Sequence, residues 1–110
     1  MKVIHKFRLE TDGQQVSLSL KQGYKIVHSE YVLVDKSVFI WVEQTLDVEV
    51  PTVNVTLKVI NSGDPVPDRL NHVMSVVDSF TPEAYHIFEV PKAGIYKAKL
   101  NLAELTYTAA

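Results

Sequence analysis

The chain contains no cysteine. This absence excludes a disulfide scaffold, a thiolate metal site and a cysteine nucleophile. An excess of charge of one sign is missing too, because 11 Lys and Arg residues against 13 Asp and Glu residues leave a net charge of −2. Such a balance provides no strong field that would draw the chain to nucleic acid or to a membrane surface. We therefore expect neither as a partner.

Long hydrophobic runs are also missing. The longest runs, such as residues 38–42, are far shorter than a bilayer span requires. Near the amino terminus, Lys6, Arg8 and Glu10 interrupt the apolar stretch that a secretory signal needs. We therefore expect the protein to be cytoplasmic.

What the sequence does contain is a clear alternation of apolar and polar residues. Hydrophobic residues make up 46% of the 110 positions and charged residues 22%, which is typical of one soluble domain with a packed core. The alternation has the period of half-buried β-strands. It is clearest in residues 52–60, where the apolar positions are Val53, Val55, Leu57 and Val59.

Turn signals containing glycine or proline recur along the whole chain. Their spacing of about ten residues is typical of a sandwich or barrel rather than of βαβ units. We expect an all-β fold, a small antiparallel β-sandwich or partly open barrel of about seven to nine strands. The β-domain is predicted at residues 1–91. Residues 92–110 are predicted to form a C-terminal extension that packs on the same sheet or on another subunit, which makes a homo-oligomer possible.

One predicted strand is apolar on both faces. Val38, Ile40 and Val42 line one face, whereas Phe39 and Trp41 line the other. Such a strand is either buried on both sides or offers one face to a partner. The pattern leaves open whether Phe39 and Trp41 belong to the core or form an apolar contact patch.

Three further residues complete the predicted partner-binding set with Phe39 and Trp41. Tyr31 lies on the preceding predicted strand, and Asp64 and Asp68 flank a rigid proline turn in the longest irregular stretch. Exposed loops on a rigid scaffold often carry binding residues. We expect these five side chains to contact a protein partner.

The histidines are the main candidates for chemistry. His5 is in register with Phe7, His72 with Met74, and His86 with other apolar residues, so all three are predicted to point toward apolar faces. Three converging imidazoles can hold zinc. However, the sequence contains no HxH or HExxH pair, and the histidines fall on different predicted strands. We predict no metal and no cofactor, with His5, His72 and His86 as weak candidates for a metal or small-ligand site.

Motifs of catalysis and of nucleic-acid binding are absent. The sequence contains no GxSxG, Walker or GxGxxG motif, so we predict no catalytic residue and no enzymatic activity. Basic and aromatic residues interleave only near the carboxyl terminus, which is too short a stretch to favour nucleic-acid binding.

Several short pieces, in shared order and spacing, resemble an uncharacterised family of small proteins encoded by bacteriophages and prophage-bearing bacteria. The resemblance covers roughly residues 1–91 and departs from the family pattern at Ser62-Gly63-Asp64. The pieces that carry it are His5-Lys6-Phe7, Ile40-Trp41-Val42, Gly63, Pro65-Val66-Pro67, His72-Val73 and His86-Ile87-Phe88-Glu89.

The resemblance implies a phage-encoded or prophage-encoded accessory protein and supplies no activity or cofactor. We therefore expect a non-enzymatic protein that binds and blocks a host protein in the host cytoplasm. A virion component, such as a decoration or connector protein, is one alternative. A metal-binding or small-ligand-binding domain that uses the three histidines is the other.

Overall fold

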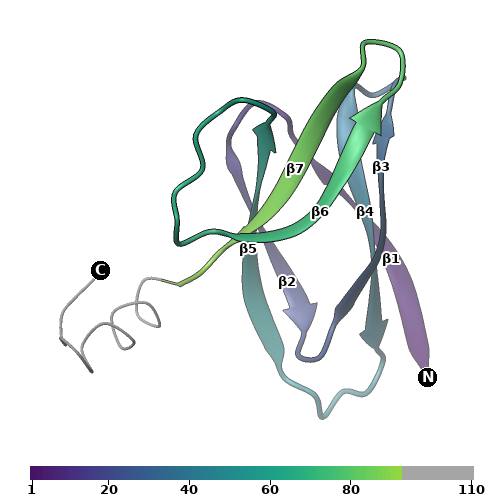
Figure 1. The fold of residues 1–110 in the computed structure, drawn as a ribbon. Coiled ribbons are helices and arrows are strands. Elements are labelled where there is room, and N and C mark those ends of the chain that lie inside the picture. The colour runs from purple at the N-terminus through teal and green to yellow at the C-terminus, as the bar shows by residue number, and fades with distance from the viewer. Residues whose placement is uncertain (93–110) are drawn as a thin grey trace, which may run out of the picture.

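The computed structural model describes residues 1–92, and all seven secondary-structure elements in this part are β-strands (Figure 1). The predicted all-β fold is confirmed, with a strand number at the lower end of the expected range. No helix among these residues is long and apolar enough to cross a membrane. The strands are β1 (Lys2–Leu9), β2 (Gln15–Lys21), β3 (Lys25–Val32), β4 (Ser37–Thr45), β5 (Thr52–Asn61), β6 (Asn71–Asp78) and β7 (Glu83–Val90).

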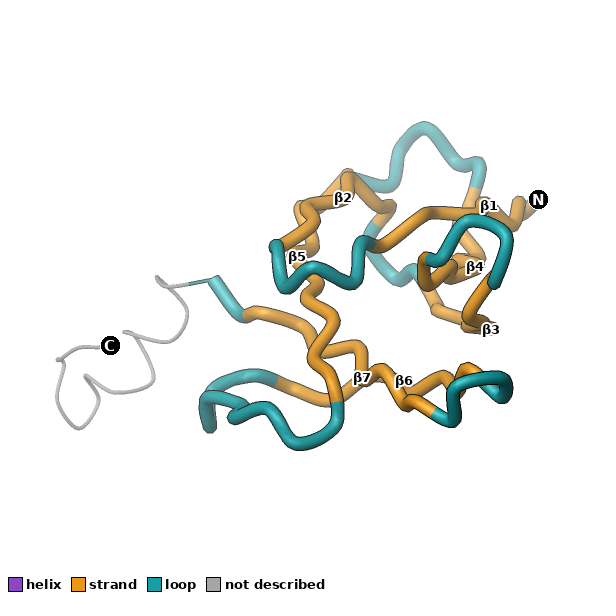
Figure 2. Tube along the Cα trace, turned by 90° about the horizontal axis from the view of Figure 1, so that it is seen from above, coloured by secondary structure: helices purple, strands orange, loops and turns teal. Residues whose placement is uncertain are grey.

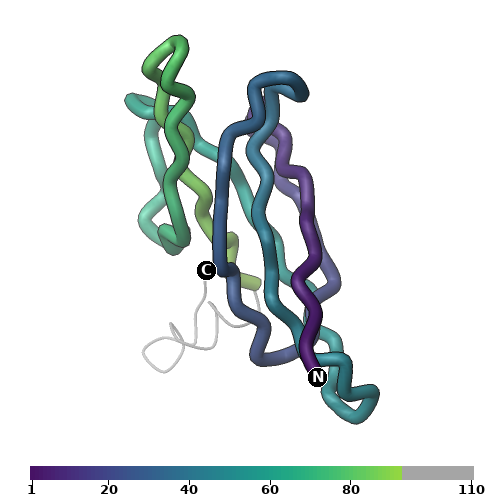
Figure 3. The backbone as a smooth tube through the Cα atoms, turned by 90° about the vertical axis from the view of Figure 1, so that its right-hand side faces the viewer, coloured from purple at the N-terminus to yellow at the C-terminus, as the bar shows by residue number. Residues whose placement is uncertain are grey.

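Two antiparallel sheets pack face to face as a sandwich, whose two layers are seen side on in Figure 3. Sheet A has three strands in the order β1-β4-β3, and sheet B has four in the order β2-β5-β7-β6. The view from above shows β6 and β7 in one layer and β3 and β4 in the layer opposite them (Figure 2). Apart from Lys92, the predicted C-terminal extension lies outside the described residues, so its packing stays a prediction.

The core between the sheets consists of alternate side chains of each strand. On β4, the side chains of Val38, Ile40 and Val42 have no exposed surface. Leu57 on β5 and Ile87 on β7 meet them from sheet B in the same cluster. Fully burying one such side chain contributes about 1.5–3 kcal/mol, so the alternation determines which face of each strand turns inward.

Two irregularities change which face a side chain occupies. The pairing of β3 with β4 shifts register between Ile26 and His28, and the pairing of β6 with β7 shifts between His72 and Met74. One extra residue in a strand moves the side chains that follow it to the opposite face. The prediction that His72 shares a face with Met74 is therefore wrong. His72 lies on the outer face of sheet B, and Met74 packs against the core.

We predict that Val42→Ala lowers the free energy of unfolding by roughly 1.5–3 kcal/mol, because it removes buried methyl groups and leaves a cavity. Val77 on β6 is 62% exposed and provides the matched control. The change Val77→Ala should alter stability by less than about 0.5 kcal/mol. Urea denaturation followed by circular dichroism measures both variants. Equal losses in the two would contradict this assignment of the core face.

Candidate functional site

An aromatic pair lies on the central strand of sheet A, on the face turned away from sheet B. Since Val38, Ile40 and Val42 point into the core, the alternation of β4 directs Phe39 and Trp41 outward. Their ring centroids are 6.5 Å apart. Phe39 is only 8% exposed and Trp41 is half-buried, although neither belongs to the cluster between the sheets. Side chains of the flanking strands therefore cover much of both rings.

Strand β1 contributes cations to one side of this pair. The Lys6 ammonium lies 5.1 Å from the centroid of the Phe39 ring, a cation–π contact. Arg8 is paired in register with Phe39, and its Nε donates to Ser37 Oγ at 3.0 Å and lies 3.1 Å from Glu10 Oε2. These contacts orient the Arg8 side chain, whose residue is paired in register with Phe39.

Strand β3 contributes side chains to the other side of the aromatic pair. The His28 ring lies 5.2 Å from the Trp41 ring, and its Nε2 is 3.1 Å from Glu30 Oε1. The register shift before His28 places its imidazole on this outer face, in register with Trp41. We call the surface formed by six side chains the aromatic face; these are Lys6, Arg8, His28, Glu30, Phe39 and Trp41.

The five predicted partner-binding residues do not form one surface. Phe39 and Trp41 lie on the aromatic face, whereas Tyr31 stacks on Tyr85 of sheet B with ring centroids 5.1 Å apart. Tyr31 therefore joins the two sheets. Asp64 and Asp68 are exposed in the loop that connects β5 to β6, beside sheet B. The residues that surround the two rings instead are Lys6, Arg8 and His28, which the prediction did not include.

Two of the three candidate histidines come together, on the outer face of sheet B. Ser75 Oγ lies 2.9 Å from His72 Nε2 and 2.7 Å from His86 Nδ1. On the other side of the ring, His86 Nε2 lies 2.8 Å from Ser62 Oγ. Serine hydroxyls therefore contact both nitrogens of the His86 ring.

His5 lies elsewhere, on β1 of sheet A, where its Nδ1 is 3.1 Å from Gln44 Nε2. The buried Gln44 side chain also accepts a hydrogen bond from the Lys21 backbone N–H at 2.7 Å. The three histidines thus do not converge on one site. Among residues 1–92, no group of three or more His, Asp or Glu side chains is arranged to hold a metal ion.

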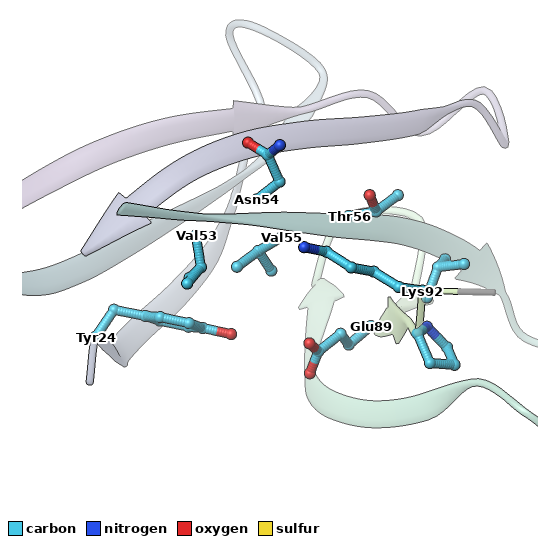
Figure 4. A pocket seen from close by; sticks show the side chains of 9 residues that line it. Tyr24, Val53, Asn54, Val55, Thr56, Glu89 and Lys92 are labelled. Carbon is cyan, nitrogen blue, oxygen red and sulfur yellow. The ribbon is translucent and has the colours of Figure 1, made fainter. Parts of the chain in front are cut away.

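A cavity of about 280 Å³ opens where β7 ends (Figure 4). Val53 and Val55 of β5 form an apolar wall, and the Tyr24 hydroxyl and the Glu89 carboxylate point toward each other on the same side. Burial raises the pKa of Tyr24 above 10.0, and the negative charge of Glu89 raises it further. The sequence pattern gave no sign of this cavity, because it depends on where β7 leaves β5.

The family comparison covers almost the whole chain. The family described as "Domain of unknown function (DUF7352)" matches residues 1–102. The chain belongs to this family. The match continues past residue 91, where the β-domain was predicted to end. No curated protein and no solved structure matches the chain.

We predict that stability falls as the pH rises through and above 10.0, in part through Tyr24. A tyrosine whose pKa is higher in the folded state favours folding below its unfolded value, and this advantage is lost at higher pH. Tyr24→Phe should therefore lose less melting temperature between pH 9 and 11 than the unmodified protein. Glu89→Gln removes the negative charge, which is the smaller cause of the raised Tyr24 pKa. It should therefore reduce the loss of melting temperature by less than Tyr24→Phe does. An unchanged pH dependence in Tyr24→Phe would contradict the assignment.

Proposed function

We propose that this protein is a non-enzymatic protein-binding domain whose contact surface is the aromatic face. The observation that carries the proposal is the half-buried Trp41, which lies beside Phe39 on a central strand and is surrounded by charged side chains. Binding surfaces commonly have an aromatic centre and a polar rim, and tryptophan and arginine are frequent at their most important positions.

The side chains of the aromatic face are held in place before a partner arrives. Lys6 contacts the Phe39 ring, His28 contacts both Trp41 and Glu30, and Arg8 contacts Ser37. Binding costs less conformational entropy when side chains are already ordered. A rigid, three-stranded sheet therefore supports a surface that needs little rearrangement on binding.

Glu10 and Glu30 already contact Arg8 and His28, so Lys6 is the cation of this face that favours an acidic group on the partner. Lys6 lies over an aromatic ring, so a carboxylate of the partner placed above Lys6 would gain a charge-assisted hydrogen bond. Trp41 would contribute apolar area beside this contact. The mechanism is steric, because a bound domain covers a surface of its partner.

The biological setting that we propose rests on the resemblance to phage-encoded proteins. In that setting the protein is an accessory protein that acts in the cytoplasm of the host and blocks a host protein. The aromatic face is the surface of capture, and no bond is made or broken.

We predict that Trp41→Ala weakens partner capture by at least about thirtyfold, the loss expected from truncating a dominant contact residue. Phe88, on the outer face of sheet B, is the matched control, and Phe88→Ala should leave capture unchanged. Tagged protein is incubated with lysate of a bacterial host, and the proteins retained by each variant are compared by quantitative mass spectrometry. Melting curves establish that both variants remain folded.

A pair of charge reversals tests the same surface without removing an aromatic ring. Lys6→Glu replaces a cation of the aromatic face, and Lys58→Glu replaces one on the outer face of sheet B. The proposal requires that capture of the same protein falls in Lys6→Glu and persists in Lys58→Glu. Equal retention by all four variants would refute the aromatic face as the contact surface.

A further inference from the structure

One stretch of β5 is paired on one side only. Strand β2 pairs with β5 from Lys58 to Thr52, but β7 pairs with it only from Asn61 to Thr56. Within the described residues, positions 52–55 therefore have no strand on the β7 side. Backbone N–H and C=O groups point alternately to the two sides of a strand, so two of these four residues direct theirs toward the open side.

The cavity described above runs along this open edge. It is lined by four consecutive residues of β5, Val53 to Thr56, by residues 89–92, and by Tyr24 on the side of Val53 and Val55. Figure 4 shows Asn54 and Thr56 on one side of the strand and Val53 and Val55 on the other. A cavity above one face of a sheet would be lined by alternate residues. This cavity therefore runs beside the strand and extends over the face that carries Val53 and Val55, and we call it the β5 slot.

We propose that the β5 slot receives residues 95–102 of a second copy of this chain as an additional strand. In this segment, apolar Tyr96, Ala98, Leu100 and Leu102 alternate with Lys97, Lys99 and Asn101. Paired with β5, the apolar set would continue the wall of Val53 and Val55, and the polar set would lie with Asn54. Strand addition to an open edge gains affinity from backbone hydrogen bonds and specificity from alternate side chains.

The pairing of β7 with β5 argues against the same chain as occupant. Val90 pairs with Thr56, so a straight continuation of β7 would bring residues 91–94 opposite positions 55–52. That stretch contains Pro91, which has no N–H to donate, and Gly94, which weakens a strand. Residues 95–102 would then lie beyond the start of β5.

A reversal of the chain at residues 91–94 does not reach the slot either. It would return the segment alongside β7, which already pairs with β5 at one edge and with β6 at the other. A second copy does not meet this obstacle. Lys92 lines the slot, so each chain leaves its own domain beside it, and a twofold axis nearby would bring each segment to the slot of the other copy.

The family match supports the choice of segment. It extends to residue 102, so residues 95–102 belong to the sequence that the family shares, whereas residues 103–110 lie beyond the match. Residues 103–110 therefore provide control positions within the same full-length chain.

Disulfide trapping tests the proposal, because the natural chain has no cysteine to interfere. Asn54→Cys marks the slot, and Lys97→Cys, Lys99→Cys or Asn101→Cys marks the segment in each register. When a tagged slot variant and an untagged segment variant are mixed and mildly oxidised, we expect a covalent dimer that contains one of each. No mixed dimer should form when Lys58→Cys, outside the slot, replaces the slot variant. The same holds when Thr108→Cys, outside the matched segment, replaces the segment variant. Equal trapping by the controls, or no mixed dimer in any register, overturns the proposal.

The double variant Asn54→Cys/Lys99→Cys separates the two possible sources of the strand. Oxidised at high dilution, it should give no cross-link within one chain, and a covalent monomer would show that the chain fills its own slot. Light scattering of the unmodified protein should give twice the chain mass. Ala98→Pro should halve that mass, since proline cannot donate to the ladder, whereas Ala109→Pro should not. A monomeric unmodified protein overturns the proposal, and none of these results depends on partner capture by the aromatic face.

Discussion

The burial of both faces of β4 is the constraint on which sheet A depends. The inward valines and Ile40 exclude water from the space between the sheets, and this fixes the register of β4 against β1 and β3. Because side chains alternate, the same register directs Phe39 and Trp41 to the opposite face. The aromatic face is thus a direct consequence of the core. A one-residue slip of β4 would turn the aromatic pair toward sheet B and remove the aliphatic residues from the core, at a cost of several side-chain burials.

In sheet B, β5 is constrained by strand pairing on both sides along only part of its length. Strand β7 pairs with β5 only as far as Val90, because the next residue is a proline that has no N–H for the ladder. Among the described residues, the first residues of β5 pair with β2 but have no strand on the β7 side. Exposed strand edges are usually shortened, charged or covered, since they invite pairing with other chains. An apolar slot at such an edge therefore supports the proposal that a further strand covers it.

The sequence predicted those features that depend on local alternation. The strand predicted at residues 52–60 and the two-faced character of β4 both follow from a period of two, and the structure contains them, the first as β5 at Thr52–Asn61. Whether Phe39 and Trp41 belong to the core or form a contact patch could not be predicted, because the answer depends on which strands flank β4. Lys6 and His28 come from opposite neighbours of β4, and only the sheet order brings Lys6 to Phe39 and His28 to the neighbouring Trp41.

The histidines show the limit of the same reasoning. A bulge adds one residue without an obvious sign in the sequence, and every side chain after it changes face. For this reason His72 meets Ser75 and His86 on the outer face instead of pointing with Met74 into the core. The slot escaped prediction for a related reason, since Pro91 marks the end of a strand but does not tell which partner strand is left with an open edge.

The two proposed surfaces lie on different parts of the molecule, and this has a consequence for binding strength. The aromatic face belongs to the outer side of sheet A, whereas the slot lies at an edge of sheet B. In the proposed dimer, the slots and not the aromatic faces would form the contact between the two copies. Two linked surfaces bind a partner that presents two copies of its epitope far more tightly than one surface does, without any new contact. Such a gain would let the proposed dimer hold a multimeric partner that a single copy would release.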